Sequence, residues 1–327
     1  MEVVGPDECT PPPGGSAVTI GAYDGIHLGH RALLDELRSR ADRLGLRTAV
    51  VTFDRHPATV VRPDSAPLLL TDLDQKLELI EACGIDRTLV VPFDETRADE
   101  SAEDFVSEVL VGDLAARLVV VGEDFHFGHG RKGNVGVLRE IGRTAGFEVV
   151  GVGLHGAVGE PVSSTRIRIL VAAGHVGEAA ALLGRPHQVR GRVVRGDGRG
   201  GPVLGFPTAN IELPEGIAVP GHGVYAGSYE RPDGTVHPAA VSFGRRPTFY
   251  DSAPPILEAF LLDFEGDLYG EEARVSFFER LHGDLRFDSV EALVTQMRHD
   301  AEQTRRLVAD RRAPGRPPTP GRPPAPR

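Results

Sequence analysis

Two histidines three positions apart, His27 and His30, stand in a short turn that also contains Gly25 and Gly29. A β-prone apolar run precedes the turn and an apolar pattern with helical spacing follows it, which predicts a strand, a turn and then a helix. In α/β folds such a turn lies at the carboxyl end of a strand, where ligands bind, and free N–H groups at a helix start suit phosphate. The pattern therefore predicts a phosphate site. A capping histidine and a zinc site are the alternatives, although the nearby sequence offers no tidy set of further zinc ligands.

The elements that would position this turn alternate along the first half of the chain. The expected strands cover residues 17–20, 48–53, 87–91, 118–121 and 148–152. The expected helices cover residues 31–37, 72–83, 102–111, 163–174 and 176–183. One expected strand, 118–121, is apolar throughout, as in a strand that is buried on both faces. The alternation predicts an α/β fold with a doubly wound, Rossmann-like parallel sheet.

The pattern changes after Gly184-Arg185-Pro186, where we place the domain boundary. Short strands separated by Gly, Pro and Asp turns are expected at 189–194, 224–228, 236–241, 257–262 and 273–277, followed by one helix at 289–312. This pattern is typical of a small antiparallel β-barrel or sandwich. We therefore expect a flexible lead at 1–16, an α/β domain at 17–186, a β domain with a C-terminal helix at 187–312, and a disordered Pro/Arg-rich tail at 313–327.

The composition narrows the class of protein. The chain has 327 residues and a net charge of −11, which disfavours a broad nucleic-acid-binding surface. Two cysteines, Cys9 and Cys83, do not suggest a disulfide framework and fit a reducing cytoplasm. No apolar run approaches the length of a membrane span, and the first residues do not resemble a signal peptide. We expect a cytoplasmic protein without nucleic-acid or membrane partners.

Several short blocks, taken in order, carry a resemblance to a known family. The turn matches the HxGH signature of nucleotidyltransferases. The further blocks are FDRHP at 53–57, VGEDFHFG at 121–128, STRIR at 164–168, GFPTAN at 205–210, GVY at 223–225, RPTF at 246–249 and DLYG at 267–270. Together they resemble the bacterial bifunctional riboflavin kinase/FAD synthetase family over about residues 17–312.

The resemblance implies two transfer reactions. A riboflavin-kinase barrel would move the γ-phosphoryl group of ATP to the 5′-hydroxyl of riboflavin, giving FMN. The nucleotidyltransferase domain would move AMP from a second ATP onto FMN, giving FAD and pyrophosphate. Both steps would use Mg²⁺ and ATP. The implied partners are small molecules (riboflavin, FMN, FAD and ATP), with no obligate protein partner and with self-assembly allowed.

For the first domain, the resemblance implies that His27 and His30 stabilise charge on the ATP phosphates, with Gly25 and Gly29 shaping the turn. A second phosphate motif would consist of Ser164, Thr165 and Arg168, because hydroxyl groups at a helix start and a guanidinium one turn later suit an anion. An ordinary capped helix is the alternative. Near the flavin, the resemblance implies Asp124, with Phe125 and Phe127 flanking the isoalloxazine ring; core packing of the two phenylalanines is the alternative.

For the second domain, the resemblance implies that Thr208 and Asn210 bind Mg²⁺ through oxygen atoms and that Glu258 is the general base of the kinase. Glu258 stands in an otherwise apolar strand, where a solvated face is the alternative. A glycine-rich segment would face the phosphates through Gly196, Gly198, Gly200 and Gly205, and His282 would belong to the loop over the flavin.

Three residues depart from the family pattern, and all lie in the kinase domain. His282 replaces a frequent Arg, Pro202 a frequent basic residue, and Ser242 a frequent Asn. Neutral histidine does not provide a permanent bidentate clamp. We therefore hypothesise a kinase that is weakened or tuned to a modified flavin. The alternatives are an enzyme that retains only FMN adenylylation, a flavin-binding regulator, and a nucleotidyltransferase for another substrate such as a phosphopantetheine-like group.

Overall fold

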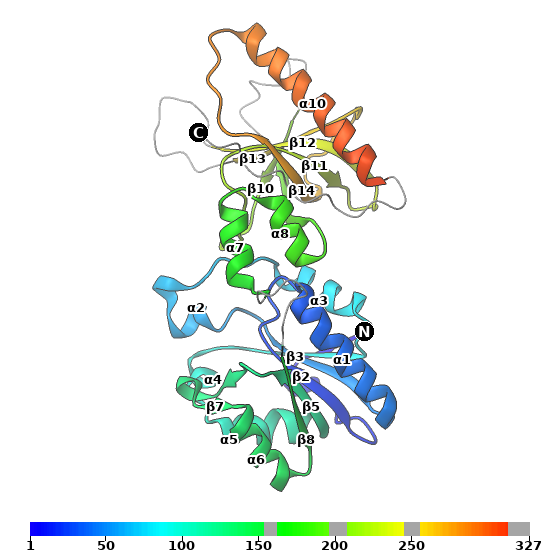
Figure 1. Cartoon of the computed structure of the whole chain (residues 1–327), viewed down its shortest axis with the longest axis vertical. Coiled ribbons are helices and arrows are strands. Elements are labelled where there is room, and N and C mark those ends of the chain that lie inside the picture. The colour runs from blue at the N-terminus through cyan, green and yellow to red at the C-terminus, as the bar shows by residue number, and fades with distance from the viewer. Residues whose placement is uncertain (154–161, 196–207, 245–255, 313–327) are drawn as a thin grey trace. The chain divides into compact units, whose positions relative to one another are not determined.

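The computed structural model describes residues 1–153, 162–195, 208–244 and 256–312. The chain divides into two compact units, Met1–Ser164 and Thr165–Arg327 (Figure 1). Helices α7 (Ser164–Ala172) and α8 (Val176–Leu183) therefore group with the second unit, apart from the first residue of α7. This division falls earlier in the chain than the boundary at 184–186 that the sequence suggests.

The first unit contains a six-stranded sheet in the order β1-β4-β3-β2-β5-β8, with parallel pairing throughout. Its strands are β1 (Glu2–Val4), β2 (Ser16–Ile20), β3 (Arg47–Phe53), β4 (Arg87–Val91), β5 (Ala116–Gly122) and β8 (Glu148–Val152). Helices α1 (Leu28–Leu44) and α3 (Leu73–Ala82) pack on one face. The other face is covered by α5 (Ala102–Phe105), the π-helical segment η3 (Val106–Asp113) and α6 (Val135–Ala145). The predicted doubly wound parallel sheet is confirmed.

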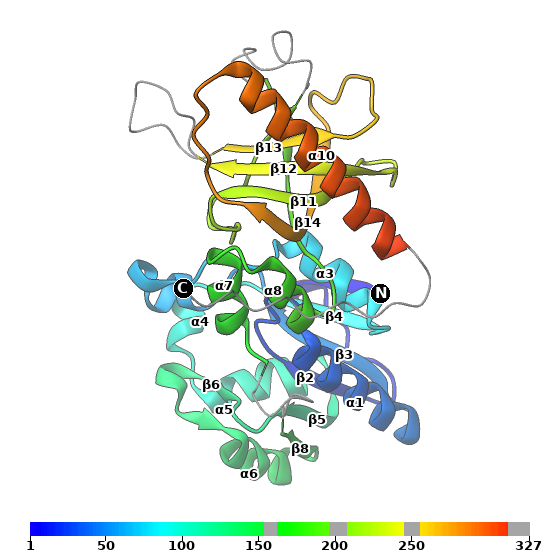
Figure 2. The ribbon, with the colours of Figure 1, turned by 45° about the horizontal axis from the view of Figure 1, so that its top comes forward.

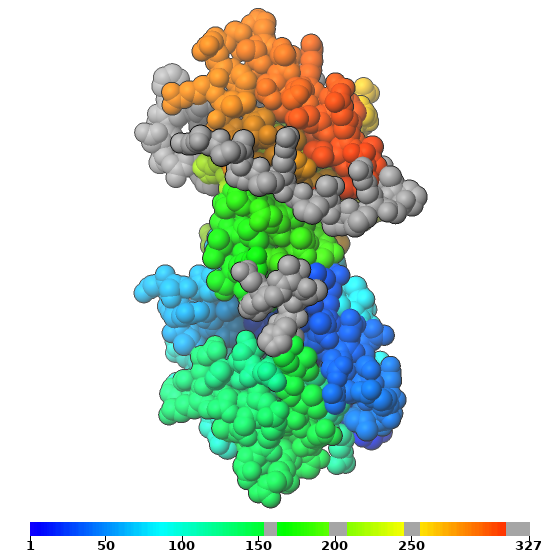
Figure 3. Space-filling model, viewed as in Figure 1, coloured from blue at the N-terminus to red at the C-terminus, as the bar shows by residue number. Residues whose placement is uncertain are grey.

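Strand β2 is largely apolar on both of its faces because both faces are buried. Val18 and Ile20 contribute to one core, whereas Ala17 contributes to the other. Successive side chains of a strand point to opposite faces, so a strand covered by helices on both sides buries every residue. The outer surfaces of α1 and α6 form part of the exterior of this unit (Figure 3).

The expectation of a flexible lead is wrong for the first residues. Strand β1 pairs in parallel with β4 at the edge of the sheet. The amino group of Met1 lies 2.7 Å from Glu81, and Arg87 donates to Glu2 at 2.8 Å. These contacts tie the chain start to a sheet edge that would otherwise expose unpaired backbone groups. A three-residue strand followed by Gly5 and Pro6 carries too little local signal to be predicted.

Short elements connect the main ones in the first unit. They are η1 (Pro6–Glu8), α2 (Ala58–Val61), η2 (Pro63–Ser65), α4 (Glu95–Asp99), β6 (His126–Phe127), η4 (His129–Arg131) and β7 (Gly133–Asn134). Helix α5 is capped by Ser101, whose side chain accepts from the Asp104 N–H at 3.0 Å.

The second unit contains a closed antiparallel barrel in the order β10-β13-β12-β11-β14-β9. Its strands are β9 (His187–Val194), β10 (Ala209–Glu212), β11 (Gly223–Glu230), β12 (Val236–Gly244), β13 (Ile256–Leu261) and β14 (Glu272–His282). The interior is filled by buried residues such as Val241, Ala259 and Phe277. Helix α10 (Val290–Arg312) runs across β11 and β12 (Figure 2). The barrel, rather than a sandwich, is therefore the observed architecture.

Candidate active sites

The turn after β2 holds two non-glycine residues in left-handed backbone. Tyr23 has φ of 50° and Ile26 has φ of 37°, and both side chains are fully buried. The Tyr23 hydroxyl lies 2.6 Å from the Thr19 hydroxyl. Such backbone is unfavourable for side-chain-bearing residues and persists where packing determines it, which is common at functional sites. The fold therefore fixes the shape of the turn that presents the two histidines.

The two histidines lie face to face at the start of α1. His27 caps the helix by accepting from the His30 N–H at 3.2 Å, and the ring centroids are 3.6 Å apart. Burial, with a smaller contribution from nearby His27, holds the pKa of His30 well below its usual value. The Nδ1 atom of His30 is buried and has no hydrogen-bond partner within the described ranges. A Cβ on Gly29 would lie 3.2 Å from the His27 ring, so a side chain there would crowd the stacked rings.

Asp24 organises the backbone around this turn, although nothing in the local sequence marks it as a key residue. Its buried carboxylate accepts from the Leu70 N–H at 2.9 Å and from the Thr71 N–H at 3.1 Å. The Thr71 hydroxyl accepts in turn from the Gly25 N–H at 3.1 Å. The Ser164 hydroxyl donates to the Asp24 carbonyl at 2.9 Å. The fold thus joins predicted phosphate-motif residues Gly25 and Ser164 through Asp24.

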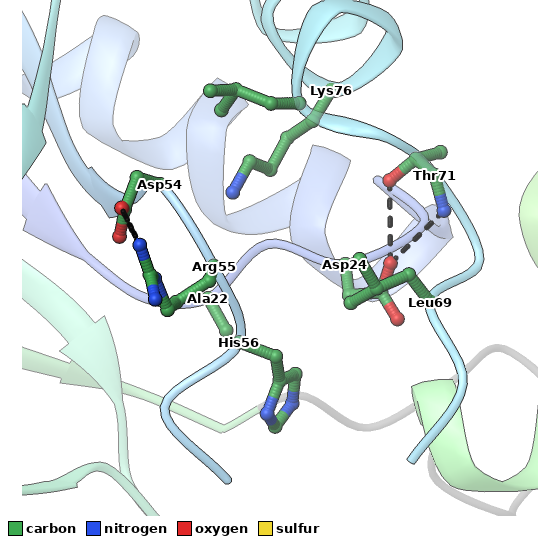
Figure 4. Close-up of a pocket in the computed structure, with 9 residues that line it drawn as sticks. Ala22, Asp24, Asp54, Arg55, His56, Leu69, Thr71 and Lys76 are labelled. Atoms are coloured by element: carbon green, nitrogen blue, oxygen red, sulfur yellow. Dashed lines mark hydrogen bonds and ion pairs between the residues drawn. The ribbon is translucent and has the colours of Figure 1, made fainter. Parts of the chain in front are cut away.

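A small pocket opens where β2 and β3 end (Figure 4). It is lined by Ala22, Asp24, Asp54, Arg55, His56, Leu69, Thr71, Leu73 and Lys76. Lys76 is 7% exposed, and its ammonium donates to the Phe53 carbonyl at 2.7 Å. Burial lowers the pKa of Lys76 to about 8, against the opposing effect of the Asp24 and Asp54 carboxylates. Nothing in the local sequence distinguishes this lysine from an exposed lysine on a helix.

The other predicted residues of the adenylyl-transfer motifs lie on two further elements. Thr165 is exposed and Arg168 is half-buried on α7. Asp124 is exposed just after β5. The contacts of these three residues with phosphate and flavin therefore stay predictions.

The predicted pair of flavin-flanking rings has a different arrangement. Phe125 and Phe127 stack on each other with centroids 5.3 Å apart, and Phe127 is 9% exposed within the core. A ring inserted between two others needs about 9 Å between the outer centroids, twice the shortest usual spacing of aromatic pairs. The pair therefore does not flank an open slot, and core packing accounts for Phe127. An apolar residue type alone does not distinguish these two uses.

In the second unit, the strand register brings predicted kinase residues into one row. Glu258 of β13 pairs directly with Asn210 of β10 on one side and with Ser242 of β12 on the other. Ser242 pairs in turn with Val224 of β11, which pairs with His282 of β14. Directly opposed residues share a face of the sheet. All five are partly exposed, whereas the residues next to Glu258, Leu257 and Ala259, point into the barrel core.

His282, predicted to face the flavin, has contacts that link β14 to α10. One ring nitrogen lies 3.0 Å from the Asp300 carboxylate and the other lies 2.7 Å from the Gly283 carbonyl. Asp300 is buried and also accepts from Gln296 at 2.9 Å. Asp300 has no signal in the sequence, where it resembles a solvated residue of an amphipathic helix.

The two residues predicted to bind magnesium carry side-chain oxygen atoms. Thr208, just before β10, is half-buried, and Asn210 is half-buried next to Glu258. Within the described ranges, no group of three or more His, Cys, Asp or Glu side chains suits a metal ion. A hydroxyl and an amide oxygen, completed by phosphate and water, match the preference of Mg²⁺. The predicted glycines Gly196, Gly198, Gly200 and Gly205, as well as Pro202, lie outside the described residues.

Comparison with known proteins accounts for both units. A FAD synthetase family model matches residues 10–166, and a riboflavin kinase family model matches residues 183–308. The bifunctional riboflavin kinase/FMN adenylyltransferases of Listeria monocytogenes and Escherichia coli K12 are each 37% identical to this chain. The alignments cover 89% of the chain and 92% of the Listeria protein, and 88% of the chain and 91% of the E. coli protein.

A solved structure agrees over nearly the whole chain. The crystal structure described as a macrolide-efflux protein from Streptococcus pneumoniae has a TM-score of 0.83 and 30% identity, and the match covers 93% of this chain and 99% of that one. None of the described helices is long and apolar enough to cross a membrane. The fold and the two matched domains define a two-domain transferase of flavin-nucleotide synthesis. The chain belongs to the bifunctional riboflavin kinase/FMN adenylyltransferase family, which confirms the resemblance found in the sequence.

Proposed function

We propose that the second unit phosphorylates riboflavin at the Glu258 row and that the first unit adenylylates FMN at the His27–His30 turn. The observation that carries the kinase assignment is the register that pairs Glu258 with Asn210. It brings a carboxylate that can accept a proton next to an amide oxygen that suits a phosphate-bound cation. A flavin-binding regulator would need neither group in this arrangement.

In the kinase step, Glu258 would accept the proton of the riboflavin 5′-hydroxyl as that oxygen attacks the γ-phosphorus of ATP. The bond from the γ-phosphorus to the bridging oxygen breaks, and ADP leaves. Thr208 and Asn210 would hold Mg²⁺, which supplies charge neutralisation on the phosphates when bound. Ser242, on the other side of Glu258, would orient its carboxylate.

In the adenylyl transfer, a phosphate oxygen of FMN attacks the α-phosphorus of ATP and pyrophosphate leaves. His27 and His30 would donate ring N–H groups to the phosphate oxygens on which charge develops. The unpartnered, buried Nδ1 of His30 supports this role, because it leaves a polar atom that a bound phosphate would satisfy. Ser164, whose hydroxyl donates to the Asp24 carbonyl, would hold the start of α7 against the same turn.

Product chromatography tests both assignments with one pair of substrates. Wild-type protein with Mg²⁺ and ATP should give FAD from riboflavin and from FMN. Glu258→Gln should slow FAD formation from riboflavin by about 100-fold or more, a typical loss for a general base, and leave formation from FMN unchanged. Glu265→Gln, an exposed glutamate in the same unit, is the matched control. Equal rates from riboflavin in the two variants would contradict the role of Glu258, and no FAD from FMN in wild type would contradict the adenylyl-transfer proposal.

A second candidate is a kinase tuned to a modified flavin. It is supported by His282, whose two ring nitrogens already contact Asp300 and Gly283. A panel of riboflavin analogues, compared by kcat/KM, distinguishes the two candidates. We further propose that the protein acts in the cytoplasm on small molecules, without nucleic-acid or membrane partners. The thiol form of Cys9 and Cys83, neither of which is in a disulfide, supports the location.

A further inference from the structure

Lys76 is an unusual group in the first unit because it is a buried lysine at the edge of the sheet where the phosphate site is proposed. It extends from the first turn of α3, and its ammonium lies between Asp54 and Asp24 in the pocket (Figure 4). Its hydrogen bond to the Phe53 carbonyl fixes it to the end of β3. Burying a charged ammonium is unfavourable unless partners compensate it, and the two carboxylates are those partners.

The composition of the chain makes this position more informative. Lys76 and Lys132 are the two lysines of the whole sequence, and all its other Lys/Arg residues are arginines. Lys132 is exposed. A compact ammonium can donate to one carbonyl in a small space, whereas a planar guanidinium needs a wider fork of acceptors. Lysine is therefore better suited than arginine to the contact with the Phe53 carbonyl.

Without Lys76, the carboxylates around it would repel the anionic substrates that we propose for this site. Asp24 follows β2 and Asp54 follows β3, so two carboxylates stand at the edge that must receive the anions ATP and FMN. Arg55 pairs with Asp54 at 3.1 Å, but its side chain is 59% exposed and therefore screened by water. His56 accepts from the Ala58 N–H, and Asp72 caps helix α3. Lys76 is thus the buried cation among these groups.

We propose that Lys76 is a positioning residue of the adenylyl-transfer site, where its ammonium offsets the Asp24 and Asp54 carboxylates and so admits the phosphates of ATP and FMN. This inference rests on the proposed function of the first unit. Lys76 acts through charge and through Asp24, which holds the histidine turn, and it does not contact the reacting atoms. Anion binding and protonation of Lys76 are therefore coupled, and each favours the other.

The coupling predicts a direction for the pH dependence. Lys76 loses its charge as the pH rises through about 8. The kcat/KM for FMN adenylylation should then fall as the pH rises through this range, mainly through KM for ATP. A bound polyanion should move the titration of Lys76 to higher pH.

Nuclear magnetic resonance reads this titration without an activity assay. Protein labelled with ¹³C and ¹⁵N only at lysine gives two side-chain signals, which Lys132→Arg assigns. The Lys76 signal should titrate near pH 8 and move upward when FMN and a non-hydrolysable ATP analogue are added. A Lys76 midpoint that the nucleotides leave unchanged would overturn the proposal. This readout stands whether or not the wild-type protein forms FAD, so it separates failure of this inference from failure of the proposed function.

Variants test the consequence for catalysis. Lys76→Met should raise KM for ATP in FMN adenylylation by about tenfold, the effect of one lost favourable charge at intermediate distance, with a smaller change in kcat. Lys76→Arg should recover part of KM and remove the alkaline fall. Lys132→Met is the matched control, and the riboflavin kinase rate of each variant reports on general damage. An alkaline fall that persists unchanged in Lys76→Arg would overturn the proposal. If Lys76→Met does not fold, the wild-type titration decides.

Discussion

Replacing Asp24 by Asn should destabilise the first unit selectively around the histidine turn. The Asp24 carboxylate accepts from the Leu70 N–H with both oxygens, at 2.9 and 3.0 Å, and from the Thr71 N–H at 3.1 Å. Asparagine has nearly the same shape but no charge, and its amide NH₂ would face the Leu70 N–H as a second donor. The substitution therefore isolates the contribution of the charge.

The expected cost follows from these contacts. A hydrogen bond to a charged group contributes about 1 kcal/mol more than a neutral one, so two backbone donors account for about 2 kcal/mol. Buried Lys76 loses one of its two carboxylate neighbours, which adds about 1 kcal/mol. The total of about 3 kcal/mol corresponds to a roughly 150-fold increase in local opening.

Hydrogen exchange read by mass spectrometry measures this opening where it should occur. A peptide covering residues 68–73 contains the Leu70 and Thr71 amides, and its exchange should accelerate strongly in Asp24→Asn. The matched control is Asp42→Asn, an exposed aspartate on α1. If the two variants exchange alike in this peptide, the Asp24 charge does not hold the turn, and the argument from its hydrogen bonds is refuted.

Two further predictions concern histidines. His282→Ala removes a partner of buried Asp300, so it should lower the free energy of unfolding of the second unit by about 2 kcal/mol. Denaturant unfolding should show this loss. It should show no comparable loss for His299→Ala, which changes an exposed histidine on α10, the helix that carries Asp300. The pKa of His30 is lowered in the folded protein, so the unfolded chain binds a proton more readily there. Stability from this residue is therefore present above about pH 6.5 and lost as the pH falls toward the lowered pKa. His30→Gln should flatten the acid part of a plot of unfolding free energy against pH, and an unchanged slope between wild type and variant would contradict the assigned burial.

Local patterns determined much of this protein from sequence alone. Apolar periodicity predicted five of the six strands of the first sheet and the change to a small antiparallel β domain, because the burial pattern of a strand is written into consecutive residues. The turn with His27 and His30 was predicted as a strand-to-helix junction, and the structure places their rings face to face. The order of motif blocks was sufficient to indicate the family.

Contacts between distant segments were decided only by the tertiary structure. The row of Asn210, Glu258 and Ser242 depends on strand register across the barrel, and a shift of one residue would reverse every side chain. The pairing of β1 with β4 and the link between His282 and Asp300 have no local signature. Lys76 is the clearest case: its sequence neighbourhood describes an ordinary helix, whereas its burial and its charge partners come from two strand ends elsewhere in the chain. Electrostatic environment is a property of packed neighbours, so it exists only once the chain has folded.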